Sequence, residues 1–367
     1  MITEKGKETL LGDKNVQSNF PSLTGLRFLL ALVIVYFHTR ALIGAAEPSA
    51  LGAFLRNYGG LIGNQTFFTL SGFLIAYHYL DMLWSGKKDF PSFLKGRLVK
   101  LYPLYFLGAL ECILFDLVAN GFTNVNFEAV SLNLLMMATG WFRDVYRFNS
   151  PLWFFGVVVL CYMVFFMVCY LARKNRRIIL YVSVALSIWG YVLMTNAWTL
   201  PFMSHWTGEG LHSFFLGVLL CEAYKVLQHR TMKGLCIAGG VAVVFVAFLG
   251  CVFGFSEIAG SGYLWVTLLL SPMLVIGSIE IPPLRAILGN RFMENLGKMS
   301  MSIIVWHMPV FDVLYWVLYQ RGYFLNGHSH WVRLAIYMTV LLIGSRISYQ
   351  IIEKKLGTVL KKKLLLK

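Results

Sequence analysis

Two ionisable residues, Arg27 and His38, lie within the first long apolar segment of the chain, LTGLRFLLALVIVYFHTRALIG (23–44). Eleven positions separate them, so in a helix they share one face and lie about 16 Å apart along the axis. Ionisable side chains inside a bilayer are costly, which makes them candidates for function. An imidazole titrates near neutral pH and can act as a general base. The structural alternatives are an Arg27 side chain that snorkels to the interface and a histidine satisfied within the core. The shared face favours one continuous cavity that contains both residues.

Arg97 and Lys100 form a second candidate pair in FLKGRLVKLYPLYF (93–106). Their i,i+3 spacing places both on one helix face. Two neighbouring cations can bind a polyanionic ligand such as a phosphate group. They could equally belong to the excess of positive charge at the cytoplasmic side of a membrane. Pro103 is expected in the early turns of the third spanning helix, where proline is best tolerated.

Three further residues, Ser71, Trp153 and His307, are candidates for an acceptor site or for a structural role. Ser71 precedes Gly72 in FFTLSGFLIAYHY (67–79), and such a small pair favours close helix packing. Trp153 belongs to SPLWFF (150–155), and His307 precedes a mid-helix proline in LGKMSMSIIVWHMPV (296–310). A proline there frees a backbone carbonyl, to which a structural histidine could bond. Cysteine and histidine spacings typical of metal sites are absent from the sequence, so we expect no metal.

The elements that must position these residues are membrane-spanning helices. Hydrophobic residues make up 58% of the chain and charged residues only 13%, against about 25% charged residues in a soluble domain. The apolar residues form segments of about 20 residues, long enough to cross a bilayer. Such segments must be helical because lipid cannot satisfy backbone groups. We therefore predict an all-α, multi-pass membrane protein of ten helices, at 23–43, 60–80, 98–119, 151–172, 178–198, 208–228, 234–254, 263–281, 299–319 and 332–352. Residues 129–142 are too short to span and are expected to form a re-entrant or interfacial helix.

The charge distribution predicts an orientation. With both termini in the cytoplasm, segments on that side hold 24 of the 32 Lys and Arg residues, as the positive-inside rule requires. The net charge of +15 therefore needs no nucleic-acid partner. Residues 1–22 lack the features of a signal peptide. We predict a cytoplasmic segment over 1–22, one membrane domain over 23–353 and a basic cytoplasmic tail over 354–367, located in the cell (inner) membrane.

Together, these motifs resemble acyltransferase family 3 of membrane O-acyltransferases over roughly residues 20–355. Arg27 and His38 match the family's Arg-x10-His element, and Arg97-x-x-Lys100 followed by YPLY matches its basic element, with Lys in the second place. The order of the remaining matches is also the family's: GGLIGNQTFFTLSGFLI (59–75), SPLWFF, LGKMSMSIIVWHMPV and ISYQIIEK (347–354). Many members carry a glutamate shortly after the PLW motif. This chain has valines at 157–159, so its chemistry cannot need a carboxylate there.

The resemblance implies an acyl-CoA donor, usually acetyl-CoA, and a carbohydrate acceptor such as a cell-surface polysaccharide or its lipid-linked precursor. Arg97, Lys100 and Arg27 would bind the phosphates of the donor, and His38 would act as the general base on the acceptor hydroxyl. Direct transfer is preferred, and an acyl-histidine intermediate is the alternative. Other hypotheses are a succinyl or other acyl donor, or a lipid or macrolide acceptor. A transporter or flippase of a glycan or lipid-linked sugar is a further alternative, although the inverted repeats common in transporters are not evident.

Overall fold

The computed structural model of the chain describes residues 20–39, 50–196, 198–227, 231–242, 262–316 and 330–365. The predicted all-α fold is confirmed: regular structure in these residues is helical, and β-pairing within them is limited to an isolated bridge between Leu200 and Met203. The first half contains α2 (Pro21–His38), α4 (Ala50–Trp84), α5 (Phe90–Asn120), α6 (Phe127–Leu134), η1 (Ser150–Leu152), α7 (Trp153–Leu171), η2 (Ala172–Lys174), α8 (Arg177–Thr195) and α9 (His205–Val226). The second half contains a helix over Thr231–Ala242, α12 (Gly262–Trp265), the π-helix η3 (Val266–Leu270), α13 (Ser271–Glu280), α14 (Pro282–Leu288), α15 (Arg291–Gly297), α16 (Ser300–Leu314), α17 (His330–Ser348), the π-helix η5 (Tyr349–Leu356) and α18 (Gly357–Leu365).

Several of these helices can cross a bilayer, which makes the chain a multi-pass membrane protein. In the described residues, five are long and apolar enough by length and composition: Pro21–His38, Phe90–Asn120, Ser150–Lys174, Arg177–Thr195 and Val332–Leu364. A sixth span results if Val266–Glu280 and Pro282–Leu288, which meet at a bend of 86°, count as one. The count of ten spans and the cytoplasmic location of both termini stay predictions. The second half of the predicted span 234–254 lies outside the described residues.

The extent of helical structure differs from the expected boundaries at three places. Helix α5 begins at Phe90, with a proline in its first turn, so Pro103 lies in the middle of the helix. The eight-residue α6 ends at Leu134, so only the first part of the segment 129–142 is helical; the chain then turns, with Met136 at φ 63°. The expected tail from residue 354 continues α17 as helix to Leu365.

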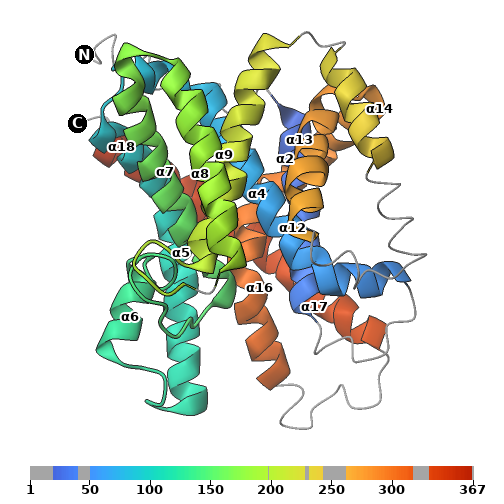
Figure 1. Cartoon of the computed structure of the whole chain (residues 1–367). Helices are drawn as coiled ribbons and strands as arrows, with labels where there is room; N and C mark the ends of the chain where they lie inside the picture. The colour runs from blue at the N-terminus through green and yellow to red at the C-terminus, as the bar shows by residue number, and fades with distance from the viewer. Residues whose placement is uncertain are drawn as a thin grey trace.

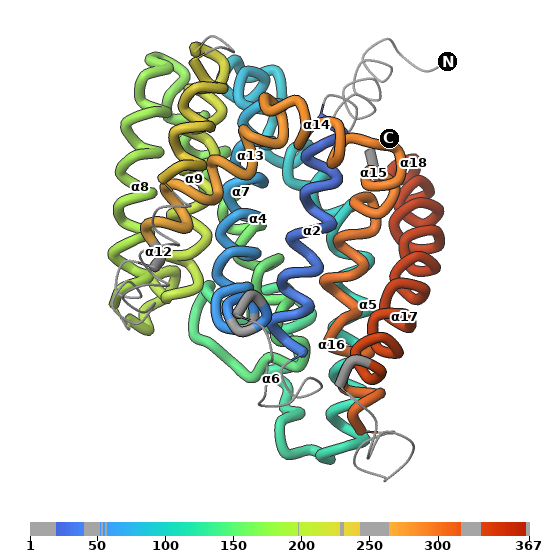
Figure 2. The backbone as a smooth tube through the Cα atoms, turned by 90° about the vertical axis from the view of Figure 1, so that its right-hand side faces the viewer, coloured from blue at the N-terminus to red at the C-terminus, as the bar shows by residue number. Residues whose placement is uncertain are grey.

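Helix α4 is the central element of the bundle. In Figure 2, α8 and α9 lie on one side of α4, and α2, α16 and α17 lie on the other. A Cβ atom at Gly72 would lie 1.9 Å from the Phe214 carbonyl oxygen of α9, and one at Gly217 would lie 2.0 Å from the Thr69 carbonyl oxygen of α4. The two backbones therefore touch, as the small pair at 71–72 predicted.

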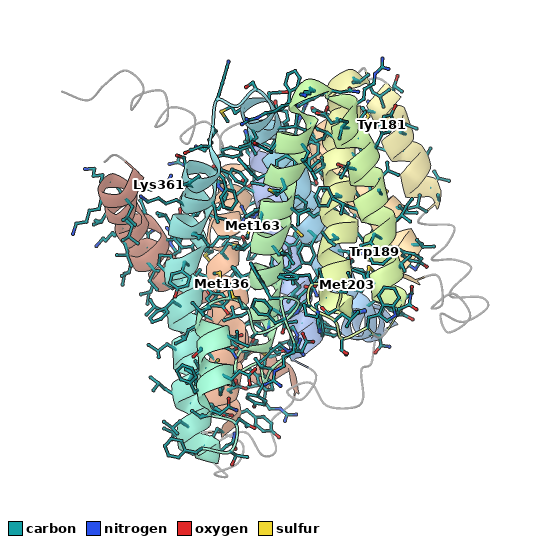
Figure 3. All side chains as sticks on the ribbon, turned by 60° about the vertical axis from the view of Figure 1, so that its left-hand side comes forward. Met136, Met163, Tyr181, Trp189, Met203 and Lys361 are labelled. Carbon is teal, nitrogen blue, oxygen red and sulfur yellow. The ribbon has the colours of Figure 1, made fainter. Side chains whose placement is uncertain are left out.

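The outer surface of the bundle suits lipid. Helix α8 lies at the front of the bundle in Figure 1 and at one edge of the molecule in Figure 2, and its exposed side chains include Tyr181 and Trp189 (Figure 3). Tyr181 is 67% exposed. A row of large apolar residues with this exposure would be unfavourable in water and is expected against acyl chains.

An ionic network joins the ends of α4, α8 and α9. Arg176 contacts Asp81 at 2.6 Å and Glu222 at 3.1 Å, and Lys225 contacts Asp81 at 3.3 Å. Burial alone would raise the pKa of the Asp81 carboxyl, but the Arg176 hydrogen bond and the charge of Lys225 lower it below its ordinary value. Asp81 is therefore ionised at neutral pH, and its contribution to stability should disappear only as the pH falls through this lowered pKa.

Candidate active site

The central feature of the site is a hydrogen bond between two histidines from distant parts of the chain. The Nε2 atom of His307 lies 3.0 Å from the Nδ1 atom of His38. His307 is fully buried in α16, and His38 is half-buried as the last residue of α2. The sequence analysis placed His38 inside a helix that runs to residue 43. The described helix ends at His38, and residues 40–43 lie outside the described part of the chain.

Hydrogen bonding around the pair assigns a proton to each ring. The Nδ1 atom of His307 lies 2.7 Å from the Ile304 carbonyl oxygen, which can only accept, so Nδ1 of His307 carries a proton. Nε2 of a neutral His307 is then an acceptor, and the proton between the rings belongs to Nδ1 of His38. This arrangement leaves Nε2 of His38 as the basic nitrogen, which is the form that a general base requires.

The backbone carbonyl that Pro309 leaves open in α16 is paired differently from the expectation. Pro309 cannot donate to the Val305 carbonyl, and the sequence analysis considered His307 as the structural partner of this gap. The Asn149 side-chain amide donates to the Val305 carbonyl instead, at 3.1 Å. The Tyr337 hydroxyl donates to the His307 carbonyl at 3.0 Å. The imidazole of His307 is thus available to His38 because other side chains satisfy the interrupted helix.

His38 lines a cavity of about 380 Å³, which we call the outer cavity. Trp153 lies in its wall, and the ring of Trp153 packs on that of Trp206 with centroids 4.6 Å apart. His205 and Glu209 from the first turns of α9 also line it. The remaining lining residues are Ile34, Phe37, Asn57, Gly60, Leu61, Asn64, Phe67, Ser150, Pro151, Phe154 and Ile304.

The predicted cations Arg27, Arg97 and Lys100 come together at the other end of α2. They line two neighbouring cavities of about 130 and 230 Å³, which we call the inner cavities. Lys298, Lys354 and Lys361 line the larger one with them. Lys100 lies close enough to Arg27 and Arg97 for electrostatic repulsion among the three cations. A polyanionic ligand in these cavities could contact several of the cations at the same time.

The only carboxylate that lines these inner cavities in the described part of the chain is Glu353, which the sequence analysis did not place in the site. It lies in the π-helix η5, and its Oε1 atom accepts a hydrogen bond of 2.6 Å from the Ser302 hydroxyl. Such π-helical turns are frequent at functional sites. Val158, from the valine run that replaces the family's glutamate, also lines the smaller inner cavity.

Ser71, His78 and Tyr79 of α4 line the smaller inner cavity. Ser71 therefore lies with the cations and not with His38. Tyr79 accepts a hydrogen bond of 2.5 Å from Arg97, which orients the guanidinium group. His78 and Tyr79 were missed because their signal in the sequence, a polar pair near a helix end, is common at membrane interfaces.

The expected continuous cavity is divided in the structure. Phe67 and Phe154 line both the outer cavity and the smaller inner one, and their ring centroids are 6.0 Å apart. The two rings thus form the wall that separates the cations from His38. In the described residues no group of three or more His, Cys, Asp or Glu side chains could hold a metal ion.

Comparisons with known proteins identify the family of the chain. A family model described as an acyltransferase domain, Acyl_transf_3, matches residues 20–349, so the chain belongs to this family of membrane acyltransferases and the resemblance drawn from its motifs is confirmed. The chain is 22% identical to the O-acetyltransferase OatA of Staphylococcus aureus (strain NCTC 8325 / PS 47), over 91% of this chain and 56% of that protein. It is also 22% identical to the peptidoglycan O-acetyltransferase OatA of Listeria monocytogenes, over 79% of this chain and 49% of that protein.

A shorter match extends the list of relatives. "Protein 2 in picA locus" of Rhizobium radiobacter is 36% identical over 88 residues, which are 24% of this chain and 41% of that protein. The chain thus spans about half the length of the curated relatives that it matches. No solved structure matches it significantly.

Proposed function

We propose that this protein transfers an acyl group, most simply acetyl, from acyl-CoA to a hydroxyl of a cell-surface polysaccharide or its lipid-linked precursor. The observation that supports this proposal best is the His38–His307 pair, whose His38 lines the outer cavity on one side of an aromatic wall, with a cluster of cations on the other. Membership of the family supports acyl transfer. The names of the two OatA relatives support O-acetylation, and one of them names peptidoglycan.

The cationic end of the site suits the donor. Coenzyme A carries several phosphate charges, and Arg27, Arg97 and Lys100 offer cations around one pair of cavities. Its pantetheine arm is long and narrow. The arm would pass Phe67 and Phe154 to bring the thioester to His38, about 16 Å along α2 from Arg27.

The histidine pair suits the chemistry. Nε2 of His38 takes the proton of the acceptor hydroxyl as its oxygen attacks the thioester carbonyl carbon. A new C–O bond forms, the C–S bond breaks, and the proton passes from His38 to the departing CoA thiolate. His307 accepts a hydrogen bond from His38 throughout, which fixes the ring orientation and stabilises the imidazolium. The products are the ester and free CoA.

His38→Ala tests this proposal. General bases contribute about 10²–10⁴-fold to rate, so purified His38→Ala protein should lose at least about a hundredfold of acyl transfer from radiolabelled acetyl-CoA. Its thermal unfolding midpoint and its affinity for CoA should match those of the wild type. Wild-type turnover by this variant would exclude His38 as the base. A wild-type protein that moves glycans only along a gradient, without cleaving acetyl-CoA, would favour the transporter alternative.

Arg97→Ala tests the donor site, with Lys95→Ala as its matched control. Both residues are in the first turns of α5, but Lys95 is exposed and does not line the inner cavities. We expect Arg97→Ala to raise the KM for acyl-CoA about tenfold or more, because a charge-assisted hydrogen bond contributes about 1.5–3 kcal/mol. Lys95→Ala should leave it within about twofold, as expected of a screened surface charge. A change confined to acceptor affinity would contradict the phosphate assignment.

A further inference from the structure

The outer cavity contains a second pair of ionisable residues that the proposed reaction does not use. They are His205 and Glu209 of α9. His205 is the first residue of the helix, and Glu209 lies one turn further on the same face. The Ser204 side chain caps the helix by accepting from the backbone N–H of Thr207. Both ionisable residues line the same cavity as His38.

The hydrogen bonds of this pair require a shared proton. Nδ1 of His205 lies 2.9 Å from the Met194 carbonyl oxygen, which can only accept, so Nδ1 carries a proton. Nε2 of His205 lies 3.0 Å from Oε1 of Glu209. A bare imidazole nitrogen would repel a carboxylate oxygen at this distance. A proton therefore lies between the two atoms, held either as imidazolium and carboxylate or as neutral imidazole and carboxylic acid.

The second carboxyl oxygen, Oε2 of Glu209, is left as an acceptor in both forms. Glu209 is only 6% exposed, and Oε2 is buried without a hydrogen-bond partner in the described part of the chain. A buried acceptor that makes no hydrogen bond costs about 1–3 kcal/mol, and a bound ligand can satisfy it. The ligand must bring a donor, so a hydroxyl or N–H group fits and a phosphate or carboxylate does not.

The rest of the cavity suits a sugar ring. Trp153 and Trp206 provide apolar walls for the C–H faces of a pyranose, and Asn57 and Asn64 add polar groups that can bond its hydroxyls. The volume of about 380 Å³ lies within the ordinary range of ligand pockets. An acyl chain or sterol would leave these polar groups unsatisfied.

We propose that Glu209, held in place by His205, binds a donor group of the acceptor next to the hydroxyl that reacts, with Trp153 and Trp206 packed against its sugar ring. This inference rests on the proposed function. The reacting hydroxyl gives its only proton to His38, so Oε2 of Glu209 must bind a neighbouring hydroxyl or amide N–H. The acceptor therefore carries at least two donor groups side by side, as a pyranose unit does and a simple alcohol does not.

The experiment compares three replacements of Glu209. Glutamine can donate its amide N–H to Nε2 of His205 and leave its oxygen in the place of Oε2, so Glu209→Gln should retain acylation within about threefold. Glu209→Leu and Glu209→Met lack this acceptor oxygen and should lose about tenfold or more. Two such variants keep the test informative if one fails to fold. Glu222→Gln, on the same helix but outside the cavity, is the control.

Each variant is expressed in the source strain without its own gene, and base-labile acyl groups on the envelope glycan are measured per amount of protein. The purified variants are tested separately for stabilisation by CoA, which all should keep. Wild-type acylation by both Leu and Met variants would overturn the role of Glu209, as would equal losses in Gln and Leu. Loss of CoA stabilisation together with acylation would show a structural role. Absence of acyl groups in the strain with wild-type protein would instead refute the proposed function itself.

Discussion

One hydrogen bond joins His38 and His307 into the pair on which the proposed function rests. His307 is too deeply buried to meet a substrate, and its Nδ1 proton is already given to the Ile304 carbonyl. Its remaining nitrogen can only accept from His38, which sets the tautomer of the more exposed ring. In the proposed reaction His307 is therefore a positioning residue, and His38 is the residue that would meet the acceptor.

Residues that act as a unit lose activity non-additively. We expect His307→Ala to reduce acyl transfer about tenfold or more, since His38 would no longer be held in the basic tautomer. The double variant His38→Ala/His307→Ala should be no slower than His38→Ala alone. Initial rates from acetyl-CoA, measured at saturating CoA ester, give the three values. If the loss of rate in the double variant equalled the product of the two single losses, the two histidines would act independently.

At the scale of the helix, α16 depends on a side chain from another element. Asn149 lies just before η1 and is buried at 2% exposure, and its amide satisfies the Val305 carbonyl that Pro309 leaves open. This hydrogen bond keeps the backbone of α16 paired near His307. The residue before η1 thereby supports the helix that carries the partner of the proposed base.

Asn149→Ala should destabilise the protein by about 1–3 kcal/mol, because it leaves a buried carbonyl without a partner. Pro309→Ala restores the backbone N–H that this carbonyl would meet in a regular helix. In the double variant Asn149→Ala/Pro309→Ala we therefore expect part of the lost stability to return. Thermal unfolding midpoints in detergent provide the measurement. If the two substitutions destabilise independently, Asn149 does not act as the cap of this carbonyl.

Helices α4 and α9, which contribute residues to the cavities, cross in close contact at Gly72. Gly72→Ala would bring a methyl group to 1.9 Å from the Phe214 carbonyl oxygen, so the helices must separate. Overpacking of this kind costs about 1–3 kcal/mol or more, and we expect a clearly lower unfolding midpoint. Gly344→Ala in α17, where a Cβ meets nothing within 4 Å, is the matched control and should leave stability unchanged. Equal effects of both substitutions would contradict the close crossing.

The sequence predicted those site residues whose charge is energetically unfavourable inside a membrane-spanning segment. Arg27, Arg97 and Lys100 stood out because charge is expensive near lipid, and the structure brings them together. Glu209 and His205 did not, because a carboxylate near a helix start is ordinary until the packing of α9 places it in the wall of the same cavity as His38. Hydropathy located the apolar segments but missed the start of α5 at Phe90 and the continuation of α17 to Leu365. Helix ends made of polar residues cannot be located from hydropathy, because their residues resemble those of loops.

For the whole molecule, the two kinds of cavity lie toward opposite ends of α2 and imply substrates from opposite compartments. The basic residues near Arg27 and the described C-terminal helix α18 share one end of the bundle, since Lys361 lines the larger inner cavity. Figure 3 shows Lys361 at the edge of the molecule on α18. The positive-inside rule predicts that this end faces the cytoplasm, where the proposed donor acyl-CoA is found. His38 would then meet acceptors from the outer side.

Single cysteines at the two ends test this orientation. Phe122 follows α5, about 46 Å of helix from Phe90, and is 79% exposed. Lys174, at the end of η2, is also exposed and lies at the other end of α7 from Trp153. In intact cells, a membrane-impermeant maleimide should label Phe122→Cys, while Lys174→Cys should react only after permeabilisation.

The wild-type chain provides the background control, because its five described cysteines are buried. The reverse labelling pattern would place the cationic cavities outside the cell, away from the cytoplasmic pool of acyl-CoA. It would contradict the proposed donor site while leaving the His38–His307 pair intact. Labelling of both positions in intact cells would instead place the two ends on one side and refute transfer across the bilayer. The expected pattern would support a reaction in which donor and acceptor meet at His38 from opposite sides.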